Sequence, residues 1–592
     1  MQLIRRMLIV SLLLFAYCLI MLAVLIPWVW VAVLISAALA LCKERKHFHA
    51  FGTARWADIN DLRGMVDEGD GLIIGQMEDT TGVITATKGL FDASVPAEVA
   101  CQRFLGCRRK RPLKLVRLNR AVHTAIFAPT GAGKGVSFVI PFLLTCKDSC
   151  VVVDLKAGEL ARITAQARRK MGHRVVLLDP FKKVTATPDT LNPLEFIDRD
   201  DPYAIDNCRE TAAAMVERKE EKGDGVHFLD NAEGGIAAIA ALLVQFGEGE
   251  NKSLQALCDI VSNPQKWQKA IELMCGSDAW DGLLARMGGS LMHLKERELA
   301  SSISTIARFV RFLSTPAIAA STRSSTFNPA DLVRQKMTVY LILPPERASA
   351  LSPLLRLWIG SLLRVVVKGG LQEKNKVHFV CDEAHILGKM DQISDALTIG
   401  RGFGLRMQLY YQDCGQLKKC WPDGADQTLL ANVSQVFFAV NDTQTGKYIE
   451  ERLGKSTIII ESGGTSSSTT YQRSEQGQSS GSYSHSSNDN WQQSGRELLQ
   501  ASEIMNLPER IAITFTPGVP PIWTTLIRYY ESGFGKAAGQ FWPSVRAFAE
   551  AAIILAGIGF FTVLVTLAVH RKFTSEQGFF PVANEQRVEE RR

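Results

Sequence analysis

The chain has 592 residues, a formal net charge of +7 and 46% hydrophobic residues. This length exceeds what one ordinary hydrophobic core accommodates, so we expect two or three packed units plus tails. The modest positive charge permits contact with nucleic acid or anionic lipid but requires neither. None of the 12 cysteines falls in a C-x-x-C pair. This pattern indicates reduced thiols facing the cytoplasm, rather than a disulfide framework or a zinc site.

The N-terminal region predicts a transmembrane helical hairpin within residues 1–46. Residues 7–42 contain no charged residue, a run too long for one span of about 20 residues and just short of two. Pro27 lies in its middle with Trp28 and Trp30, as a tight interfacial turn requires. Arg and Lys flank both ends, which favours two cytoplasmic ends. One long signal peptide is the alternative, but no small-residue cleavage site follows.

The middle of the chain predicts an α/β domain. Short runs that are apolar throughout alternate with helical stretches, which is typical of parallel strands covered on both faces. Strands alternating with helices indicate a doubly wound sheet. The runs that we interpret as strands are 149–156, 174–180, 338–345, 377–384, 406–412 and 435–442.

Residues 200–330 interrupt this alternation. Strand signals are absent there, and helical patterns recur at 204–222, 231–246 and 295–313. The sequence therefore predicts an all-α domain inserted into the nucleotide-binding domain. The domain is thereby divided into 47–199 and 331–461, with its distal strands at 497–535.

Two further segments follow. Residues 462–496 are dominated by Ser, Gly, Gln and Thr with almost no aliphatic residues, so they predict a disordered surface loop, with ordering on a partner as the alternative. Residues 551–569 are long and apolar enough to cross a membrane, which predicts a span over 547–570 and a polar tail over 571–592. A buried helix of the soluble domain is the alternative for this segment.

Residues 128–137, APTGAGKGVS, resemble the phosphate-binding pattern G-x-x-x-x-G-K-[ST]. Gly133 and Lys134 are in place, whereas Ala128 replaces the first glycine and Gly135 replaces the magnesium-binding hydroxyl. An apolar strand at 123–128 precedes the loop and an amphipathic helix follows it, which is the context that a phosphate-binding loop requires. The predicted nucleotide-binding residues are Thr130, Gly131, Ala132, Gly133, Lys134, Gly135 and Val136.

A carboxylate from another strand is expected to replace the missing hydroxyl. Ser137 lies about 200° around the helix from position 135, so it points away from the phosphates. The strand 377–384 ends in Asp382 and Glu383. We expect Asp382 to orient Mg²⁺ through water and Glu383 to polarise the water that attacks ATP.

Two more polar residues adjoin the strand 406–412. Gln412 closes it and is placed to sense the γ-phosphate of ATP or to hold a water molecule. Arg401 lies on the turn before it. This arginine is either an ordinary loop cation or an arginine finger that reaches a neighbouring subunit, which requires a ring.

With these residues the chain resembles the type IV coupling proteins, the membrane-anchored hexameric ATPases of conjugation and type IV secretion. The resemblance runs from about residue 50 to residue 531. Its segments are FGTARWADINDL, HTAIFAPTGAGKGVSFVIPFLLT, VVVDLKAGEL (with Ala157 before Gly158), DEAHILGKMDQISDALTIGRGFGLRMQLYYQDCGQL, LLANVSQVFFAVND and FTPGVPPIWTTLIRYYE.

The resemblance implies a homo-hexameric ring of RecA-like P-loop domains on the bacterial inner membrane, with most of the chain cytoplasmic. ATP with Mg²⁺ would be hydrolysed at subunit interfaces, with Gln412 as the family's glutamine and Arg401 as its finger. The implied partners are the type IV secretion channel, relaxase–DNA complexes or protein effectors, and single-stranded DNA. This chain departs from the family in its almost absent periplasmic loop and its possible C-terminal span.

Two other functions compete with this interpretation. A docking receptor that has lost turnover is suggested by Ala128 and Gly135. A duplex-DNA translocase of chromosome segregation is disfavoured, because no winged helix is evident at the C-terminus.

Overall fold

The computed structural model describes residues 51–67, 71–78, 113–119, 121–216, 224–293, 296–372, 375–473 and 479–531. The chain divides into two compact units. Of the described residues, the smaller comprises 51–54 with those of Leu453–Leu498, and the larger comprises those of Arg55–Arg452 and 499–531.

The predicted membrane spans at 7–42 and 551–569 lie outside the described residues, as does the tail 571–592. Within the described part, one helical segment, Val226–Phe246, is long and apolar enough to cross a membrane. Its most apolar window is 61% buried inside the fold, and a core helix of a soluble domain passes the same test.

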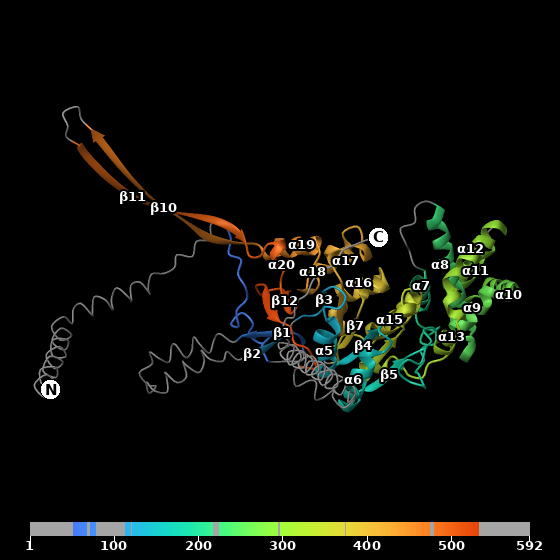
Figure 1. Ribbon diagram of the computed structural model, residues 1–592. Helices are drawn as coiled ribbons and strands as arrows, with labels where there is room; N and C mark the ends of the chain where they lie inside the picture. Colours follow the sequence, from blue (N-terminus) through green and yellow to red (C-terminus); the bar gives the residue numbers. More distant parts are fainter. Residues whose placement is uncertain are drawn as a thin grey trace, which may run out of the picture. The chain divides into compact units, whose positions relative to one another are not determined.

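The larger unit is built on an eleven-stranded sheet in the order β2-β1-β13-β12-β9-β3-β8-β7-β4-β6-β5 (Figure 1). The strands from β9 to β5 in this order run parallel. The six runs interpreted as strands and the strand predicted at 123–128 are all present, and the mixed α/β class with a large parallel sheet is confirmed. The parallel strands are β3 (Thr124–Phe127), β4 (Ser149–Asp154), β5 (Arg174–Leu178), β6 (Met337–Ile342), β7 (Val377–Cys381), β8 (Leu405–Tyr411) and β9 (Ser434–Phe438).

Stacked aromatic rings pack between neighbouring strands of the parallel sheet. Phe127 of β3 stacks on Phe437 of β9 with ring centroids 4.8 Å apart and on Tyr411 of β8 at 5.8 Å. These three residues are also direct partners in the parallel register. The stacking and the burial fix β8 and β9 on either side of β3.

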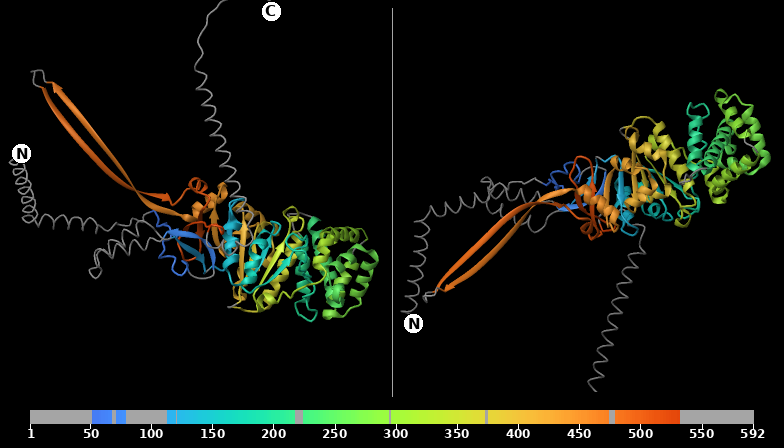
Figure 2. Two further views of the ribbon diagram at one scale, coloured as in Figure 1. Left: turned by 60° about the horizontal axis from the view of Figure 1, so that its bottom comes forward. Right: turned by 90° about the horizontal axis from the view of Figure 1, so that it is seen from above.

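Helices cover both faces of the parallel strands (Figures 1 and 2). The chain crosses from β3 to β4 and from β4 to β5 in one direction along the sheet, and from β6 to β7, β8 and β9 in the other. Because such crossovers are right-handed, the first set of helices covers one face and the second set covers the opposite face. The first set is η1 (a π-helical turn, Gly135–Val139), α5 (Ile140–Thr145) and α6 (Glu159–Lys170); the second is η4 (Pro345–Arg347), α15 (Ser352–Lys368), η5 (Ala384–Leu387), α16 (Asp391–Thr398), η6 (Gly400–Phe403), α17 (Cys414–Cys420) and α18 (Ala425–Ala431), and α19 (Thr443–Leu453) follows β9.

The described residues between β5 and β6 form helices and no strand. The second of these helices, α8, packs against its neighbours α7, α11 and α12. Side chains of Ser253 and Asn263 cap the helices that follow them, which satisfies N–H groups in the first helical turns. The helices are α7 (Ala204–Met215), α8 (Asp224–Phe246), η2 (Gly249–Asn251), α9 (Leu254–Ser262), α10 (Pro264–Cys275), α11 (Ala279–Met292), α12 (Glu296–Val310), η3 (Arg311–Ser314), α13 (Pro316–Thr322) and α14 (Asp331–Arg334).

The other side of the sheet is antiparallel. Strand β12 (Ile511–Phe515) pairs with β9 and with β13 (Ile522–Thr525), and β1 (Leu72–Glu78) joins β13 to β2 (Leu113–Leu118). The short helix α20 (Ala501–Met505) precedes β12 and begins with a capping box between Gln500 and Glu503. The sheet thus brings the chain after β13 back toward β3.

The smaller unit corrects the prediction of a disordered loop at 462–496. Strands β10 (Lys455–Arg473) and β11 (Ser479–Glu497) pair antiparallel along their whole length, as Figure 2 shows. The composition does prevent a hydrophobic core, but it leaves the backbone N–H and C=O groups free to pair across a ribbon. At its base Phe51 donates its backbone N–H to Thr457 Oγ1 at 3.0 Å.

A buried histidine gives the parallel sheet a predicted acid sensitivity. His123 precedes β3, and its Nδ1 accepts the backbone N–H of Met407 at 3.1 Å. Burial, with a further contribution from Arg406, lowers the pKa of His123 to about 3. The folded chain therefore keeps this imidazole neutral, whereas the unfolded chain protonates it below the ordinary value of 6.5.

We expect the unfolding free energy to fall by about 1.4 kcal/mol per pH unit from this residue between roughly pH 6 and pH 3. His123→Asn keeps an acceptor for Met407 and cannot titrate, so its stability should depend less on pH. Urea unfolding of both proteins at pH 7, 6 and 5 measures the difference in slope. Equal slopes would show that His123 is not the cause.

Candidate functional site

The predicted site residues from three strands meet at one edge of the parallel sheet. Strands β3, β8, β7 and β4 are consecutive neighbours, and their carboxyl ends carry the glycine loop, Gln412, Asp382–Glu383 and Asp154 respectively. Ligands of open α/β sheets bind beyond the carboxyl ends of the strands. The sheet order therefore assembles a site from segments nearly 300 residues apart in the sequence.

The loop after β3 has the backbone of a phosphate cradle. Gly131 and Gly133 have φ of 85° and 98°, a conformation that side-chain-bearing residues rarely adopt. No atom lies within 4 Å of where a Cβ would stand at Gly131 or Gly135, so the loop has open space beside both residues. The helix that follows starts with the π turn η1 before Pro141, whose missing N–H cannot continue the ordinary helical ladder.

Lys134 lies at the start of this helix and is 5% exposed. Its Nζ donates to the carbonyl oxygen of Ala128 at 2.6 Å and to that of Pro129 at 3.4 Å. Burial lowers the pKa of Lys134, while the carboxylates of Glu383 and Asp382 act in the opposite direction. The ammonium group thus rests on its own loop and faces the two acidic residues after β7.

Asp382 is the buried carboxylate of the site, with 2% exposure. Its Oδ2 lies 3.6 Å from Nζ of Lys156, and its Oδ1 has no hydrogen-bond partner among the described residues. Burial raises the pKa of Asp382, and the ammonium group of Lys156 opposes this shift. A buried carboxylate oxygen without a donor is suited to accept hydrogen bonds from metal-bound water.

Glu383 adjoins Gln412 at the carboxyl edge of the sheet. The Nε2 of Gln412 donates to Oε2 of Glu383 at 3.4 Å. Glu383 has φ of 58° and ψ of 53°, a left-handed conformation that is costly for a residue with a side chain and recurs at functional sites. The backbone N–H of Gln412 donates to Oε1 of Gln416 at 2.8 Å, which fixes the turn after β8.

The residues present fit a nucleotide with Mg²⁺. The glycine loop leaves room for phosphate oxygens. The start of the helix contributes its positive dipole, and Lys134 lies in the same loop as a counter-charge. The unpartnered Oδ1 of Asp382 suits the water shell of a magnesium ion. Thr130 and Gly131 are exposed at the tip of the loop, while Ala132 is buried.

Arg401 is the one predicted catalytic residue that the structure does not bring to this edge. It lies in η6, directly before the amino end of β8, and its side chain is exposed. The seven residues of β8 separate it from Gln412, a distance of roughly 23 Å at about 3.3 Å per residue. Arg401 therefore cannot contact the phosphate loop of its own chain in this conformation.

Sequence reasoning missed two cations of the site. Lys156 follows β4 and approaches Asp382; Asp154 holds its turn by accepting the backbone N–H groups of Lys156 and Ala161 at 3.3 and 3.0 Å. Arg528 follows β13 and donates to the carbonyl oxygen of Ala132 at 3.1 Å. A Cβ at position 133 would have to displace the guanidinium group of Arg528, and the φ of 98° disfavours a side chain there in any case.

A glycine loop between a buried parallel strand and a helix, facing an Asp-Glu pair on a nearby strand, defines a P-loop nucleotide-binding fold. Comparison with known proteins places the chain within this class. Residues 84–550 match the protein family "Type IV secretory system Conjugative DNA transfer". The chain belongs to this family, which confirms the predicted resemblance to type IV coupling proteins.

Individual relatives agree with this assignment. The chain is 27% identical over 510 residues to Protein VirD4 of Rhizobium radiobacter, covering 84% of this chain and 66% of that protein. It is 25% identical to the type IV secretion system-coupling protein VirD4 of Bartonella quintana, covering 83% of this chain and 75% of that protein. The chain thus spans about two thirds to three quarters of the length of these relatives.

The fold also resembles a solved structure. The plasmid coupling protein TrwB in complex with the non-hydrolysable ATP analogue ADPNP superposes with a TM-score of 0.51 and 18% identity, covering 70% of this chain and 87% of that one. This likeness supports the shared α/β fold.

Proposed function

We propose that the chain is a membrane ATPase that receives relaxase–DNA complexes or protein effectors and delivers them to a type IV secretion channel. The observation that carries this proposal is the meeting of Lys134, Asp382, Glu383 and Gln412 at the carboxyl edge of the sheet. These residues supply a counter-charge, a metal-orienting carboxylate, a general base and a water-holding amide, which are the parts that phosphoryl transfer to water requires.

The proposed mechanism assigns one task to each side chain. Lys134 turns from the carbonyl of Ala128 to the terminal phosphates of ATP and neutralises their charge. Glu383 accepts a proton from the attacking water, and Gln412 fixes the position of that water and of the glutamate. Bound through Asp382 and its waters, Mg²⁺ would stabilise the charge that develops on the phosphate oxygens.

The proposed assembly is a homo-hexamer on the bacterial inner membrane that passes single-stranded DNA. The family to which the chain belongs supports this assembly, and so do the two apolar segments near the ends of the sequence. The position of Arg401 also supports it, because a finger so far from its own phosphate loop can act only on a neighbour.

A docking receptor without turnover is the second candidate. It is favoured by Gly135, which stands where a phosphate-binding loop ordinarily has a metal-binding hydroxyl, and by Lys134, whose ammonium group is bonded to its own loop. This candidate would recruit the same cargo and leave the energy for transport to another ATPase.

Hydrolysis of ATP by the purified full chain distinguishes the two candidates. The measurement is phosphate release with Mg²⁺, with and without single-stranded DNA. We expect turnover that rises with DNA and disappears when Mg²⁺ is removed. Magnesium-dependent binding of ATP without any release of phosphate, with or without DNA, would favour the docking receptor.

Substitution of Arg401 tests whether the chain acts as a hexameric ring. Arg401→Ala should bind ATP nearly as the unchanged chain does and hydrolyse it poorly, because fingers contribute roughly 10³–10⁵ in rate. We expect a smaller but still large loss in a ring that moves cargo. Steady-state turnover and nucleotide titration measure the two effects, and Arg452→Ala is a control for loss of another arginine of the same unit.

Mixed assemblies test whether the arginine acts across subunits. Arg401→Ala and Lys134→Ala chains, mixed before assembly, should recover some turnover, since some interfaces then pair an intact loop with an intact arginine. An arginine acting within its own chain gives no such rescue. If hexamers form from both chains but do not recover turnover, Arg401 does not act across subunits and is an ordinary loop cation.

A further inference from the structure

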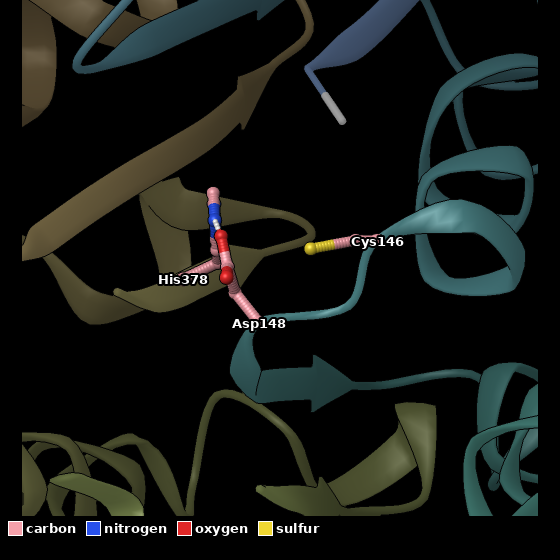
Figure 3. A group of neighbouring side chains, drawn as sticks. All are labelled: Cys146, Asp148 and His378. Carbon is pink, nitrogen blue, oxygen red and sulfur yellow. Dashed lines mark hydrogen bonds and ion pairs between the residues drawn. The ribbon is translucent and has the colours of Figure 1, made fainter. Parts of the chain in front are cut away.

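A second cluster of chemically active side chains lies at the opposite edge of the sheet. Cys146 directly follows α5 as its C-cap residue, Asp148 lies in the connection to β4, and His378 is the second residue of β7. The ligand atoms of these three residues lie within 4.8 Å of one another. Figure 3 shows the three side chains converging from the α5–β4 connection and from β7. Since the nucleotide site is at the carboxyl ends of β3, β7 and β8, the cluster is separate from it.

The donor atoms are the set that Zn²⁺ prefers. A thiol sulfur, an imidazole nitrogen and a carboxylate oxygen are all common zinc ligands, and a thiolate disfavours Mg²⁺ and Ca²⁺. The Nε2 of His378 lies 3.1 Å from Oδ2 of Asp148. Nitrogen and oxygen ligands about 2.0–2.2 Å from a tetrahedral zinc stand roughly 3.3 Å apart. Binding therefore requires only small movements of these two side chains.

The connection between α5 and β4, which carries Cys146 and Asp148, is fixed by hydrogen bonds from a buried arginine. Arg168 of α6 is fully buried and donates to the carbonyl oxygens of both Cys146 and Asp148. It also donates to Oγ1 of Thr338 on β6 at 2.9 Å. The guanidinium group thereby fixes the backbone of this turn on the sheet, and a fixed backbone is what places ligands for a metal.

Charge and space also suit a divalent ion. One thiolate and one carboxylate neutralise a 2+ charge, so the buried site would be neutral overall. Asp148 and His378 line a cavity of about 100 Å³, which has room for a water molecule of about 30 Å³ as a fourth ligand. Lys376 and Arg406 line the same cavity.

We propose that Cys146 Sγ, Asp148 Oδ2 and His378 Nε2 bind one Zn²⁺ ion, with water from the adjoining cavity as the fourth ligand. The ion displaces the proton of the Cys146 thiol and the proton shared by His378 and Asp148, and the imidazole keeps its other proton on Nδ1. The metal ties the end of the helix after the phosphate loop to the strand that carries Asp382 and Glu383.

The sequence could not indicate this site. Zinc motifs are recognised by ligands a few residues apart, and here His378 is 232 positions after Cys146. The parallel register brings the ligands together, because Ser149 of β4 is the partner of Val377 of β7. The competing interpretation is a buried histidine–aspartate pair beside an inert thiol.

Metal analysis of the purified full chain tests the proposal. We expect about one zinc per chain after exhaustive dialysis against zinc-free buffer, or after a chain stripped with chelator has been given equimolar Zn²⁺. Cys146→Ala and His378→Gln should each lower the zinc content by more than about tenfold. Cys208→Ala removes an equally buried thiol from α7 and should leave the zinc content unchanged.

Cobalt substitution keeps the test independent of whether the variants fold. The unchanged chain stripped of zinc and given Co²⁺ should show a sulfur-to-cobalt charge-transfer band in the near ultraviolet, which a thiolate ligand alone produces. Absence of both bound zinc and this band would overturn the proposal. Zinc that persists in both the Cys146 and His378 variants would overturn it as well, because the metal would then be bound elsewhere.

Discussion

Lys134→Ala is expected to reduce ATP turnover and cargo transfer to background while leaving membrane insertion intact. Among the described residues that form the phosphate loop, Lys134 supplies the only side-chain cation. It already faces Asp382 and Glu383. Loss of one preorganised donor to an oxyanion costs about 10²–10³ in rate, so loss of a charged donor should cost at least as much. Because the residue also contributes to ATP binding, turnover should fall further at limiting ATP.

Two measurements separate a lost charge from a lost fold. Lys134→Gln keeps an amide that can still donate to the carbonyl of Ala128, so it should fold normally and be equally inactive. Lys266→Ala removes an exposed lysine of α10 paired with Asp259, and should hydrolyse ATP at the normal rate. Normal cargo transfer by the Lys134 variants would be incompatible with an ATP-driven pump.

The part of the site that could be predicted consists of residues next to buried strands. The apolar runs locate β3, β7 and β8 within a few residues, and polar residues at their carboxyl ends are conspicuous. A parallel sheet places all such ends on one edge, so Lys134, Asp382, Glu383 and Gln412 could be grouped before their distances were known. The local pattern and the parallel direction of the strands place these residues on one edge of the sheet, and the sheet order makes them neighbours there.

The cations that were missed depend on sheet order instead. Lys156 follows β4, which neighbours β7 and so sets the lysine 3.6 Å from Asp382. Arg528 reaches the phosphate loop because β12 and β13 turn the chain back across β9. Both residues lie in segments that resemble the coupling-protein family, VVVDLKAGEL and FTPGVPPIWTTLIRYYE, but those segments do not indicate which strands are neighbours in the sheet. The periodicity of hydrophobic residues does not predict which residues, far apart in the sequence, become neighbours on adjacent strands.

The ribbon of β10 and β11 shows a different limit. Composition measures how much apolar surface a segment can bury, and for residues 462–496 that amount is small. Backbone pairing does not depend on apolar surface, and 19 residues of each strand pair in register. A polar composition therefore excludes a core without excluding a strand.

Glu383→Gln and Asp382→Asn are expected to separate catalysis from metal binding. Glutamine keeps the shape of Glu383 and an oxygen that can still accept from Gln412, but it cannot take a proton from water. Glu383→Gln should therefore bind ATP with Mg²⁺ nearly normally while its turnover falls by about 10²–10⁴, the usual contribution of a general base. Nucleotide titration and phosphate release on the same preparation measure both quantities.

Asp382→Asn should impair the binding of ATP with Mg²⁺, which precedes hydrolysis. It removes the negative charge that faces Lys156 and replaces one carboxylate oxygen by an NH₂ donor, so the variant should lose the part of ATP affinity that depends on Mg²⁺. ATP binding in the presence of a magnesium chelator should then differ little between this variant and the unchanged chain. Asp395→Asn, on the neighbouring helix α16, is a matched control that should change neither quantity. If Glu383→Gln and Asp382→Asn bind ATP equally poorly, the two carboxylates share one task and the proposed division between base and metal ligand is wrong.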